Sequence, residues 1–341
     1  MANPSTTSTP TSAGELLAEL SASSEVRTLL EELRQRWSTG VDRMREIAGY
    51  ALLAPGKMLR PLLLLAATEA VGGDCAGVLP AALAVEYLHV ATLIHDDVID
   101  DDDLRRGRPS VHARYGMADA LVAGDFLILT MVSTLSECAA EPAATLEAAR
   151  VLAVAGADVC RGQTREAELA SDPSCPPADY EAMVALKTGA LFRGACRAGA
   201  VLGGGAPDQV EAITRYAEHL GVAFQIYDDL LPYLADAAIT GKPSTSDVGN
   251  LRPTYPVLMG YQSASPAIRT RFADVLSGRM PVEQSYPLMQ RLLTDTGAIR
   301  RSQTRCAAEV AAARRCLAEL PGPRGVELLA AIAELSVDRD R

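Results

Sequence analysis

The residues best suited to chemistry lie in one acidic run, residues 96–103, which holds six aspartates. Asp96, Asp97 and Asp100 end an apolar stretch that begins at Leu79 and predicts one long buried helix. Asp96 and Asp100 are one turn apart and share a face, with Asp97 beside them. Carboxylates so placed repel each other by about 4 kcal/mol per pair at 4 Å and an effective dielectric of 20. The run therefore predicts bound cations, and oxygen ligands suit Mg²⁺, which usually brings phosphate oxygens with it.

The alternative is a solvated acidic loop, which is the usual meaning of a charge run. Two neighbours disfavour it. A long apolar segment precedes the run, and Arg105 and Arg106 follow it directly.

Lysine is scarce in this chain. It occurs only at Lys57, Lys187 and Lys242, although lysine and arginine together number 32. A compact ammonium differs from the planar guanidinium that the chain otherwise uses, so these three are either positions where only an ammonium serves or lysines that remain by chance. Each has a glycine within two residues.

Lys57 and Arg60 lie in a turn that leads into the buried leucines of residues 62–65. A basic turn anchored to the core suits a phosphate. His89 lies seven residues before Asp96, on nearly the same helix face. It is either a satisfied core histidine or part of the Lys57/Arg60 site, and the sequence leaves both open.

The elements that must position these residues are helices. The chain has 341 residues, is 48% hydrophobic and is dominated by Ala and Leu, with few β-branched runs. We expect a single all-α domain over residues 15–341 after a disordered segment at residues 1–14. Beyond Pro266 the pattern predicts helices at 267–276, 282–293, 297–320 and 325–335.

Composition also bounds location and partners. The net charge of −11 argues against a nucleic-acid partner. Seven cysteines without a C-x-x-C pair indicate reduced thiols in a cytoplasmic protein. We find no signal peptide, and no apolar run that approaches the 18 residues of a membrane span.

Seven motifs in order resemble those of the trans-isoprenyl diphosphate synthases. Gly56-Lys57-x-x-Arg60-Pro61 and Asp96-Asp97-x-x-Asp100 followed by Arg105-Arg106-Gly107 come first. Gly124-Asp125, Gly162-Gln163, Lys187-Thr188-Gly189, Phe224-Gln225-x-x-Asp228-Asp229 and the basic segment Thr240-Gly241-Lys242-Pro243 with 246–254 follow. The resemblance covers residues 41–259 and implies an all-α bundle of the isoprenoid synthase type around a central apolar cavity.

The resemblance implies a prenyltransferase that joins isopentenyl diphosphate head-to-tail to an allylic diphosphate (dimethylallyl, geranyl or farnesyl). Charge develops on the departing diphosphate, so metal ions and fixed cations must stabilise it. The resemblance implies Mg²⁺, three ions when substrate is bound, and a homodimer.

The resemblance also assigns roles to residues. The metal ligands would be Asp96, Asp97, Asp100, Asp228 and Asp229, and the catalytic set would be Asp96, Asp97, Asp100, Asp228, Lys187 and Lys242. Arg105, Lys187 and Lys242 would surround the leaving group, and Lys57, Arg60, His89 and Arg106 would bind the second diphosphate without metal. Thr188 and Gln225 would lie near the cation, and Arg252 would be a further substrate contact.

Two positions depart from the family pattern. Pro232 stands where a third aspartate of the second motif is usual. Because proline removes a hydrogen bond and crowds the carbonyl four residues earlier, the helix should kink or end there. Arg252 stands where a second lysine is common, which keeps the charge but not its compact shape.

The positions below Asp96 on the helix predict product length. One isoprene unit is about as long as one helical turn, ~5.4 Å. Ala91 and Thr92 lack the bulky aromatic of farnesyl-stopping members, and Tyr87 and Leu88 form the expected floor. We expect geranylgeranyl diphosphate, and a shorter product after Ala91→Phe.

Three other functions remain open. A terpene cyclase on the same fold would not need the Lys57/Arg60/His89 site, and we find no second metal motif of the Asn/Ser/Glu type. A non-catalytic partner subunit would be expected to lose the first aspartate motif, which is intact here. Irregular coupling is suggested only by Pro232.

Overall fold

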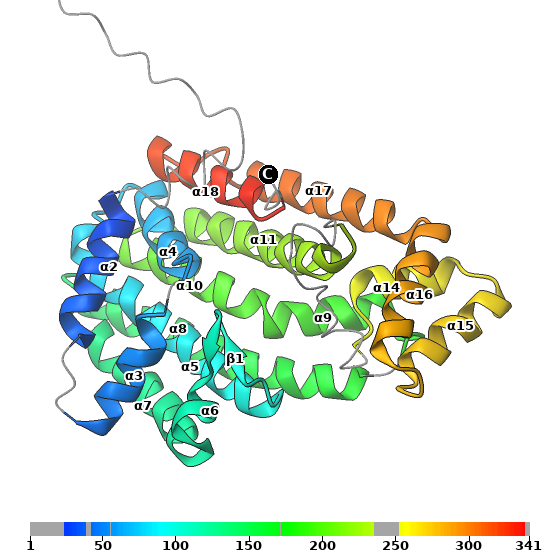
Figure 1. Ribbon diagram of the computed structural model, residues 1–341. Coiled ribbons are helices and arrows are strands. Elements are labelled where there is room, and N and C mark those ends of the chain that lie inside the picture. Colours follow the sequence, from blue (N-terminus) through cyan, green and yellow to red (C-terminus); the bar gives the residue numbers. More distant parts are fainter. Residues whose placement is uncertain (1–23, 39–41, 55, 171, 235–251, 338–341) are drawn as a thin grey trace, which may run out of the picture.

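The computed structural model describes residues 24–38, 42–54, 56–170, 172–234 and 252–337, and these are almost wholly helical (Figure 1). The elements are α2 (Ser24–Trp37), α3 (Arg43–Leu52), α4 (Leu59–Ala70), η1 (Ala76–Val78), α5 (Leu79–Ile99), β1 (Leu104–Arg105), β2 (Arg108–Pro109), α6 (Val111–Tyr115), α7 (Met117–Leu135), α8 (Pro142–Leu169), α9 (Pro177–Lys187), α10 (Gly189–Leu202), α11 (Pro207–Leu234), α14 (Tyr255–Ser263), α15 (Pro266–Leu276), α16 (Val282–Asp295), α17 (Ala298–Cys316) and α18 (Pro323–Leu335). The predicted all-α class is confirmed. Residues 1–14 lie outside the described residues, and the single domain over 15–341 stays a prediction.

The C-terminal helices agree closely with expectation. The predicted segments 267–276 and 282–293 correspond to α15 and α16, and 325–335 corresponds to α18. The third, predicted to run to residue 320, is α17 and ends at Cys316. The N-terminal helices are also defined by local signals. Asp42 caps α3 by accepting the amide N–H of Arg45 at 2.9 Å.

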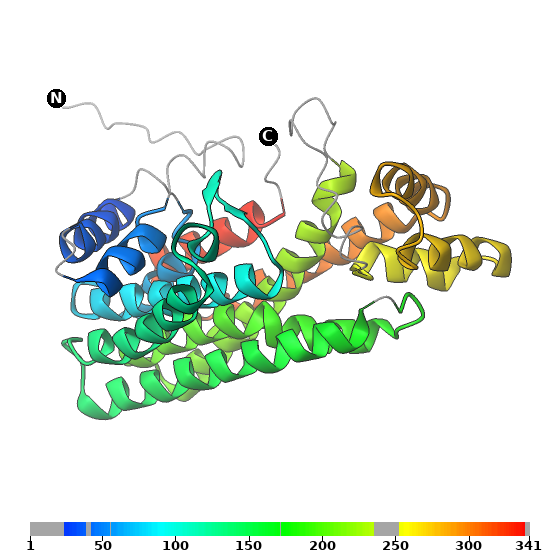
Figure 2. The ribbon, with the colours of Figure 1, turned by 60° about the horizontal axis from the view of Figure 1, so that its bottom comes forward.

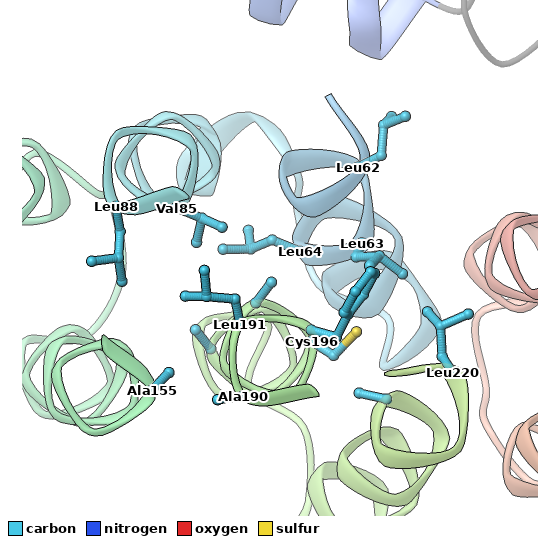
Figure 3. Close-up of a cluster of buried hydrophobic side chains, with 14 of the residues drawn as sticks. Leu62, Leu63, Leu64, Val85, Leu88, Ala155, Ala190, Leu191, Cys196 and Leu220 are labelled. Atoms are coloured by element: carbon cyan, nitrogen blue, oxygen red, sulfur yellow. The ribbon is translucent and has the colours of Figure 1, made fainter. Parts of the chain in front are cut away.

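Helix α10 lies inside the bundle, packed against α4, α8 and α11. Small residues allow this close approach. A Cβ on Gly199 would lie 2.2 Å from the carbonyl oxygen of Leu64, and one on Gly194 would lie 2.8 Å from the Cβ of Ala155. Figure 3 shows Leu64 of α4, Val85 and Leu88 of α5, Ala155 of α8 and Leu191 of α10 gathered in this core.

A second, smaller core joins α14, α15, α16 and the start of α17. These helices lie together at one side of the bundle (Figures 1 and 2). Tyr233, near the end of α11, is buried in this cluster and stacks on Tyr286 with ring centroids 5.9 Å apart. The end of α11 is therefore anchored to the C-terminal helices.

The acidic run does not continue as a helix. Helix α5 ends at Ile99, and residues 104–109 form a two-stranded antiparallel hairpin that the all-α expectation did not include. Its turn residues, Arg106 (φ 53°) and Gly107 (φ 76°), both have positive φ, as a two-residue type I′ turn requires. The hairpin directs Arg105 and Arg106 back toward the helices.

Two apolar helices bear on the expectation that the chain has no membrane span. Two helical segments, Ala76–Ile99 and Met117–Leu135, are long and apolar enough to cross a membrane by length and composition. The first is a core helix, with 67% of its most apolar window buried in the bundle, whereas the second is only 39% buried. The exposed apolar face of α7 therefore needs its own explanation.

Candidate active site

A cavity of about 220 Å³ lies where α8, α9 and α11 approach the segment before α14. It is lined by polar and apolar side chains together: Glu166, Leu169, Cys175, Tyr180, Met183, Lys187, Thr188, Gln225, Asp229, Arg252, Pro253, Thr254 and Leu258. This lining carries a row of charges and hydrogen-bonding groups beside its apolar residues. Five of the predicted site residues line it, namely Lys187, Thr188, Gln225, Asp229 and Arg252.

Ion pairs connect the cavity to the first aspartate motif. Arg252 Nη2 lies 2.8 Å from an oxygen of Asp100, and 3.8 Å from Glu166. Lys187 Nζ lies 2.5 Å from Glu166 Oε2. The C-terminal end of α5 and the cavity therefore belong to one charged site. Glu166 was missed from the sequence, although it lies one turn after Gly162 of a motif that was recognised.

Asp96 lies in a crowded acidic environment. Burial raises its pKa, and the nearby carboxylates of Asp100 and Glu166 raise it further, while Lys187 opposes the rise. Such carboxylates favour a bound cation, which would offset their repulsion. Among the described residues, no three acidic, His or Cys side chains are grouped as a ready-made metal centre. The donor set fits a hard cation that also takes oxygens from a substrate.

The side chain of Asp97 is buried and bound to an arginine. Its side chain is only 3% exposed and accepts a hydrogen bond of 2.7 Å from Nε of Arg105. Burial raises the pKa of Asp97, and Arg105 opposes that rise. The expectations that Asp97 ligates metal and that Arg105 surrounds the leaving group stay predictions, while in this structure the two side chains bind each other.

The two aspartates of the second motif, Asp228 and Asp229, also differ in burial. Asp229 is 5% exposed, and its carboxylate accepts hydrogen bonds from Gln225 Nε2 (2.9 Å), the amide N–H of Tyr255 (2.8 Å) and the hydroxyl of Tyr180. Asp228, beside it on α11, is partly exposed. The expectation that Asp229 is a metal ligand stays a prediction, and three protein donors occupy acceptor positions of its carboxylate.

Pro232 does not end the helix, since α11 continues to Leu234. The carbonyl oxygen of Pro232 accepts a hydrogen bond from the hydroxyl of Tyr286 on α16. Of the two outcomes predicted at Pro232, a kink or an end of the helix, an end at that residue is excluded. Lys242 and the rest of the basic segment lie outside the described residues.

A separate basic site forms between α4, α5 and the hairpin. Arg106 Nη1 donates to the carbonyl of Ala54 at 3.1 Å, and a Cβ on Gly56 would lie 2.6 Å from the same nitrogen. Gly56 therefore leaves the space that the Arg106 guanidinium occupies. Lys57, the next residue, is exposed in this turn, as a phosphate contact requires.

Arg60 and His89 meet in the same region. Arg60 Nη1 lies 3.0 Å from His89 Nε2, and the guanidinium lies 4.9 Å from the ring centroid of Phe192. Burial lowers the pKa of His89 well below its usual 6.5, and Arg60 and Arg106 lower it further. Because arginine only donates, neutral His89 accepts at Nε2 and carries its proton on Nδ1. The sequence left His89 open, and the structure places it beside the predicted site.

Glu86 was missed at this site. It is 3% exposed on α5, one turn before His89, and burial raises its pKa to about 7, although Arg60 and Arg106 oppose the rise. A glutamate in an otherwise apolar helix was a signal that the sequence offered. It places a buried carboxyl group beside the basic cluster.

Tyr87 and Leu88, which were predicted to limit the length of the product, contact different helices. The hydroxyl of Tyr87 accepts the indole N–H of Trp37 at 2.9 Å, so its ring faces α2. Leu88 lies against α8, 3.4 Å from where a Cβ on Gly156 would be. Figure 3 shows Leu88 directed toward the helix that carries Ala155. The expected floor of Tyr87 and Leu88 stays a prediction, although the two side chains contact different helices. Ala91 is fully buried and Thr92 partly buried.

Comparison with known proteins agrees with this geometry. The family model described as polyprenyl synthetase matches residues 41–289. The chain is 36% identical to a geranylgeranyl diphosphate synthase of Methanosarcina mazei over 69% of this chain and 76% of that protein. It is 29% identical to an octaprenyl diphosphate synthase of Escherichia coli over 92% and 94% of the two chains.

A solved structure gives the same result for the fold. The polyprenyl synthase of Caulobacter crescentus, complexed with calcium and isoprenyl diphosphate, superposes with a TM-score of 0.86 at 28% identity. The match covers 98% of this chain and 100% of that one. The chain belongs to the polyprenyl synthetase family, and it is a prenyl diphosphate synthase that elongates isoprenoid chains.

Proposed function

We propose that the chain condenses isopentenyl diphosphate with an allylic diphosphate, in the presence of Mg²⁺, to give geranylgeranyl diphosphate. The observation that carries the proposal is the pairing of two sites. An acidic cavity end with Asp96 and Asp100 lies at the end of α5, and a basic cluster of Arg60, His89 and Arg106 lies beside the same helix. A cyclase would need only the first of these.

The residues present suit a division of labour between two diphosphates. Asp96, Asp100 and Asp228 would hold the metal, which supplies Lewis-acid stabilisation of the leaving diphosphate. Three ions with bound substrate fit the family. Lys187, Arg252 and Lys242 would place positive charge around that leaving group. The basic cluster would hold isopentenyl diphosphate without metal, so only the allylic substrate ionises.

The buried side of the site favours a product longer than farnesyl. Small residues, Ala91 and Thr92, lie within the first two turns below Asp96, and Leu88 follows. Relatives of this chain include both geranylgeranyl and octaprenyl synthases, so their names do not settle the product length. We propose twenty carbons because Leu88 is the first large side chain below Ala91 and Thr92 on α5. Dimethylallyl, geranyl and farnesyl diphosphate would all serve as starters.

We also propose a homodimer in the cytoplasm. Helices α7 and α8 expose large apolar side chains. On α7 these are Met117, Leu121, Val122, Leu129 and Val132, and on α8 they are Leu146 and Val154. Each of them is at least 45% exposed. A second copy of the chain would cover this face. All seven cysteines lie in the described residues and are free, which suits a reducing compartment.

Product analysis tests the proposal. The purified chain is incubated with Mg²⁺ and each allylic diphosphate, with and without isopentenyl diphosphate. We expect geranylgeranyl diphosphate only when isopentenyl diphosphate is present. A hydrocarbon formed from geranyl diphosphate alone would show a cyclase instead, and a metal-independent product would exclude the role given to the aspartates.

A further inference from the structure

His95, the residue before Asp96, lies in a space that Gly124 leaves open. Helix α5 packs against α7, and a Cβ added to Gly124 would lie 2.2 Å from Nε2 of His95. Only glycine can therefore stand at residue 124 while the ring keeps this position. Gly124 and Asp125 form a motif that has no part in the proposed function, yet the glycine lies against the residue that precedes the first aspartate motif.

The ring of His95 is held by a main-chain acceptor of α7. Nε2 lies 3.2 Å from the carbonyl oxygen of Leu121 and 3.9 Å from the carboxylate of Asp125. The second distance is too long for a hydrogen bond, and a carbonyl oxygen can only accept. His95 therefore donates its Nε2 proton to Leu121. The side chain is 29% exposed, so water competes with this bond only in part.

The last turn of α5 needs support from outside the helix. The helix ends at Ile99, and carboxylates gather there, where the helix dipole disfavours negative charge. Neighbouring carboxylates such as Asp96 and Asp100 also repel each other. Because the last carbonyl groups of a helix have no partners within it, both effects favour fraying of this turn.

Two contacts hold this turn from different sides. Successive residues lie about 100° apart around the helix axis. Asp97 is therefore about 200° from His95, and it accepts a hydrogen bond from Arg105 of β1. Asp96 and Asp100 lie between these two, at about 100° and about 140° from His95. The contacts through His95 and Asp97 thus leave one side of the turn open, and that side carries the other two aspartates.

We propose that His95 is a positioning residue that directs Asp96 and Asp100 toward the leaving diphosphate and its metal. Its hydrogen bond to α7 fixes the rotation of the last turn about the helix axis, and Gly124 is the position on α7 that admits the ring. The proposal rests on the proposed function, since Asp96 and Asp100 need a fixed direction only if they bind the metal.

A matched pair of variants isolates the hydrogen bond. Glutamine and methionine have similar lengths and helix propensities, but only glutamine carries an N–H donor that can reach Leu121. For His95→Met we expect the affinity for Mn²⁺, titrated with inorganic diphosphate present, to fall about 10-fold, as when a group that supports a metal ligand is lost. His95→Gln should stay within about 3-fold of the wild type. Wild-type affinity in His95→Met, or an equal loss in both variants, would overturn the proposal.

The KM values for the two substrates separate positioning from a general defect. In His95→Met the KM for the allylic diphosphate should rise by about 10-fold, since that substrate binds through the metal. The KM for isopentenyl diphosphate should stay within about 2-fold, because Arg60 and Arg106 keep their own contacts with His89 and with the carbonyl of Ala54. Equal shifts in both KM values would contradict a positioning role.

His219→Met is the matched control. His219 also joins two helices, since its Nδ1 lies 2.6 Å from Glu309 of α17. It lies on α11, roughly two and a half turns before Asp228. Loss of this contact should change neither KM value, whatever it costs in stability.

Gly124→Ala tests the same fit from the other helix. The added Cβ must displace the ring of His95, so the KM for the allylic diphosphate should again rise by about 10-fold, although alanine favours a helix over glycine. In the His95→Met background the same substitution should add no more than about 2-fold, because the hydrogen bond is already absent. Effects that multiply would overturn the proposal.

If His95→Met does not fold, Gly124→Ala decides through the same pair of KM values. Failure of the proposed function would appear instead in the wild type, as a product that is not a linear prenyl diphosphate.

Discussion

One guanidinium nitrogen of Arg252 lies 2.8 Å from each of the two carboxylate oxygens of Asp100. Arg252 is 26% exposed and Asp100 18% exposed, so water screens this pair only in part. The nitrogen occupies the position between two oxygens that a bound cation would take. Arg252 and a divalent metal therefore compete for Asp100.

This competition predicts that Arg252→Gln binds metal more tightly before substrate arrives. A hydrogen bond to a charged group contributes about 1.5–3 kcal/mol, and every 1.4 kcal/mol is about tenfold in affinity. We expect the dissociation constant for Mn²⁺, measured by titration of the substrate-free protein, to fall by about 10-fold. The KM for the allylic diphosphate should rise, because the same arginine faces the leaving group.

The control for Arg252 is Arg150→Gln. Arg150 forms a similar ion pair with Glu147, at 2.6 Å, but it is 61% exposed on α8 and remote from the aspartates. Metal affinity should be unchanged in this variant. Equal metal affinity in Arg252→Gln and the wild type would show that Arg252 does not hold Asp100 in solution.

Local patterns predicted the helices and the places where charge gathers. The spacing of Asp96 and Asp100 needed only the period of one helix, and α5 places both toward the cavity end, as expected. The same reasoning could not separate Asp96 from Asp97. Adjacent residues on a helix point about 100° apart, and the hydrogen-bond partner of Asp97 is Arg105, which lies on β1, beyond the end of α5.

The sequence did not allow us to predict contacts between segments that lie far apart along the chain. Tyr180, Gln225 and Tyr255 come from three helices and converge on Asp229, and no spacing along the chain indicates this. Tyr87 and Leu88 were assigned together because they are neighbours in sequence. Their side chains point to α2 and α8, since consecutive positions of a helix face different partners.

Product length should respond to Ala91 and not to Tyr87. Ala91 is fully buried on α5 above Leu88, so Ala91→Phe would fill space that the growing chain needs. We expect farnesyl diphosphate in place of longer products, measured by chromatography of the dephosphorylated alcohols. Tyr87→Phe is the control and should leave chain length unchanged. It removes only the acceptor for Trp37, at a cost of about 1 kcal/mol in stability. Unaltered products in Ala91→Phe would contradict the proposed path of the chain.

Stability should depend on pH through Glu86, whose pKa is about 7 in the folded protein against a usual 4.5. Its folded pKa is raised, so between these values the folded state binds more protons than the unfolded state. The contribution of Glu86 is therefore fully present below pH 4.5 and is lost as the pH rises through 7. The difference is about 3 kcal/mol, at 1.36 kcal/mol per pKa unit.

Glu86→Gln removes this titration. Relative to the wild type, the variant should gain free energy of unfolding between pH 5 and pH 8, measured by denaturant titration at both values. Glu137→Gln, at an exposed glutamate that pairs with Arg36, is the control and should show no such gain. A difference between Glu86→Gln and the wild type that does not change with pH would mean that Glu86 is already ionised at pH 5.

The exposed face of α7 predicts the oligomeric state. Leu129 is 71% exposed and Val122 53% exposed, and they lie on one side of a helix that is otherwise part of the bundle. Burying a leucine contributes about 1.5–3 kcal/mol, and a two-fold interface counts each residue twice. Leu129→Glu would replace that gain with two buried carboxylates, so the dissociation constant of the dimer should rise at least about 100-fold. Sedimentation at micromolar concentration should then show a monomer.

Leu104→Glu is the control for Leu129→Glu. Leu104 is similarly exposed, at 63%, but it lies on the hairpin, so this variant should stay dimeric. A wild-type monomer would leave the α7 face without a second copy to cover it and would exclude the proposed dimer.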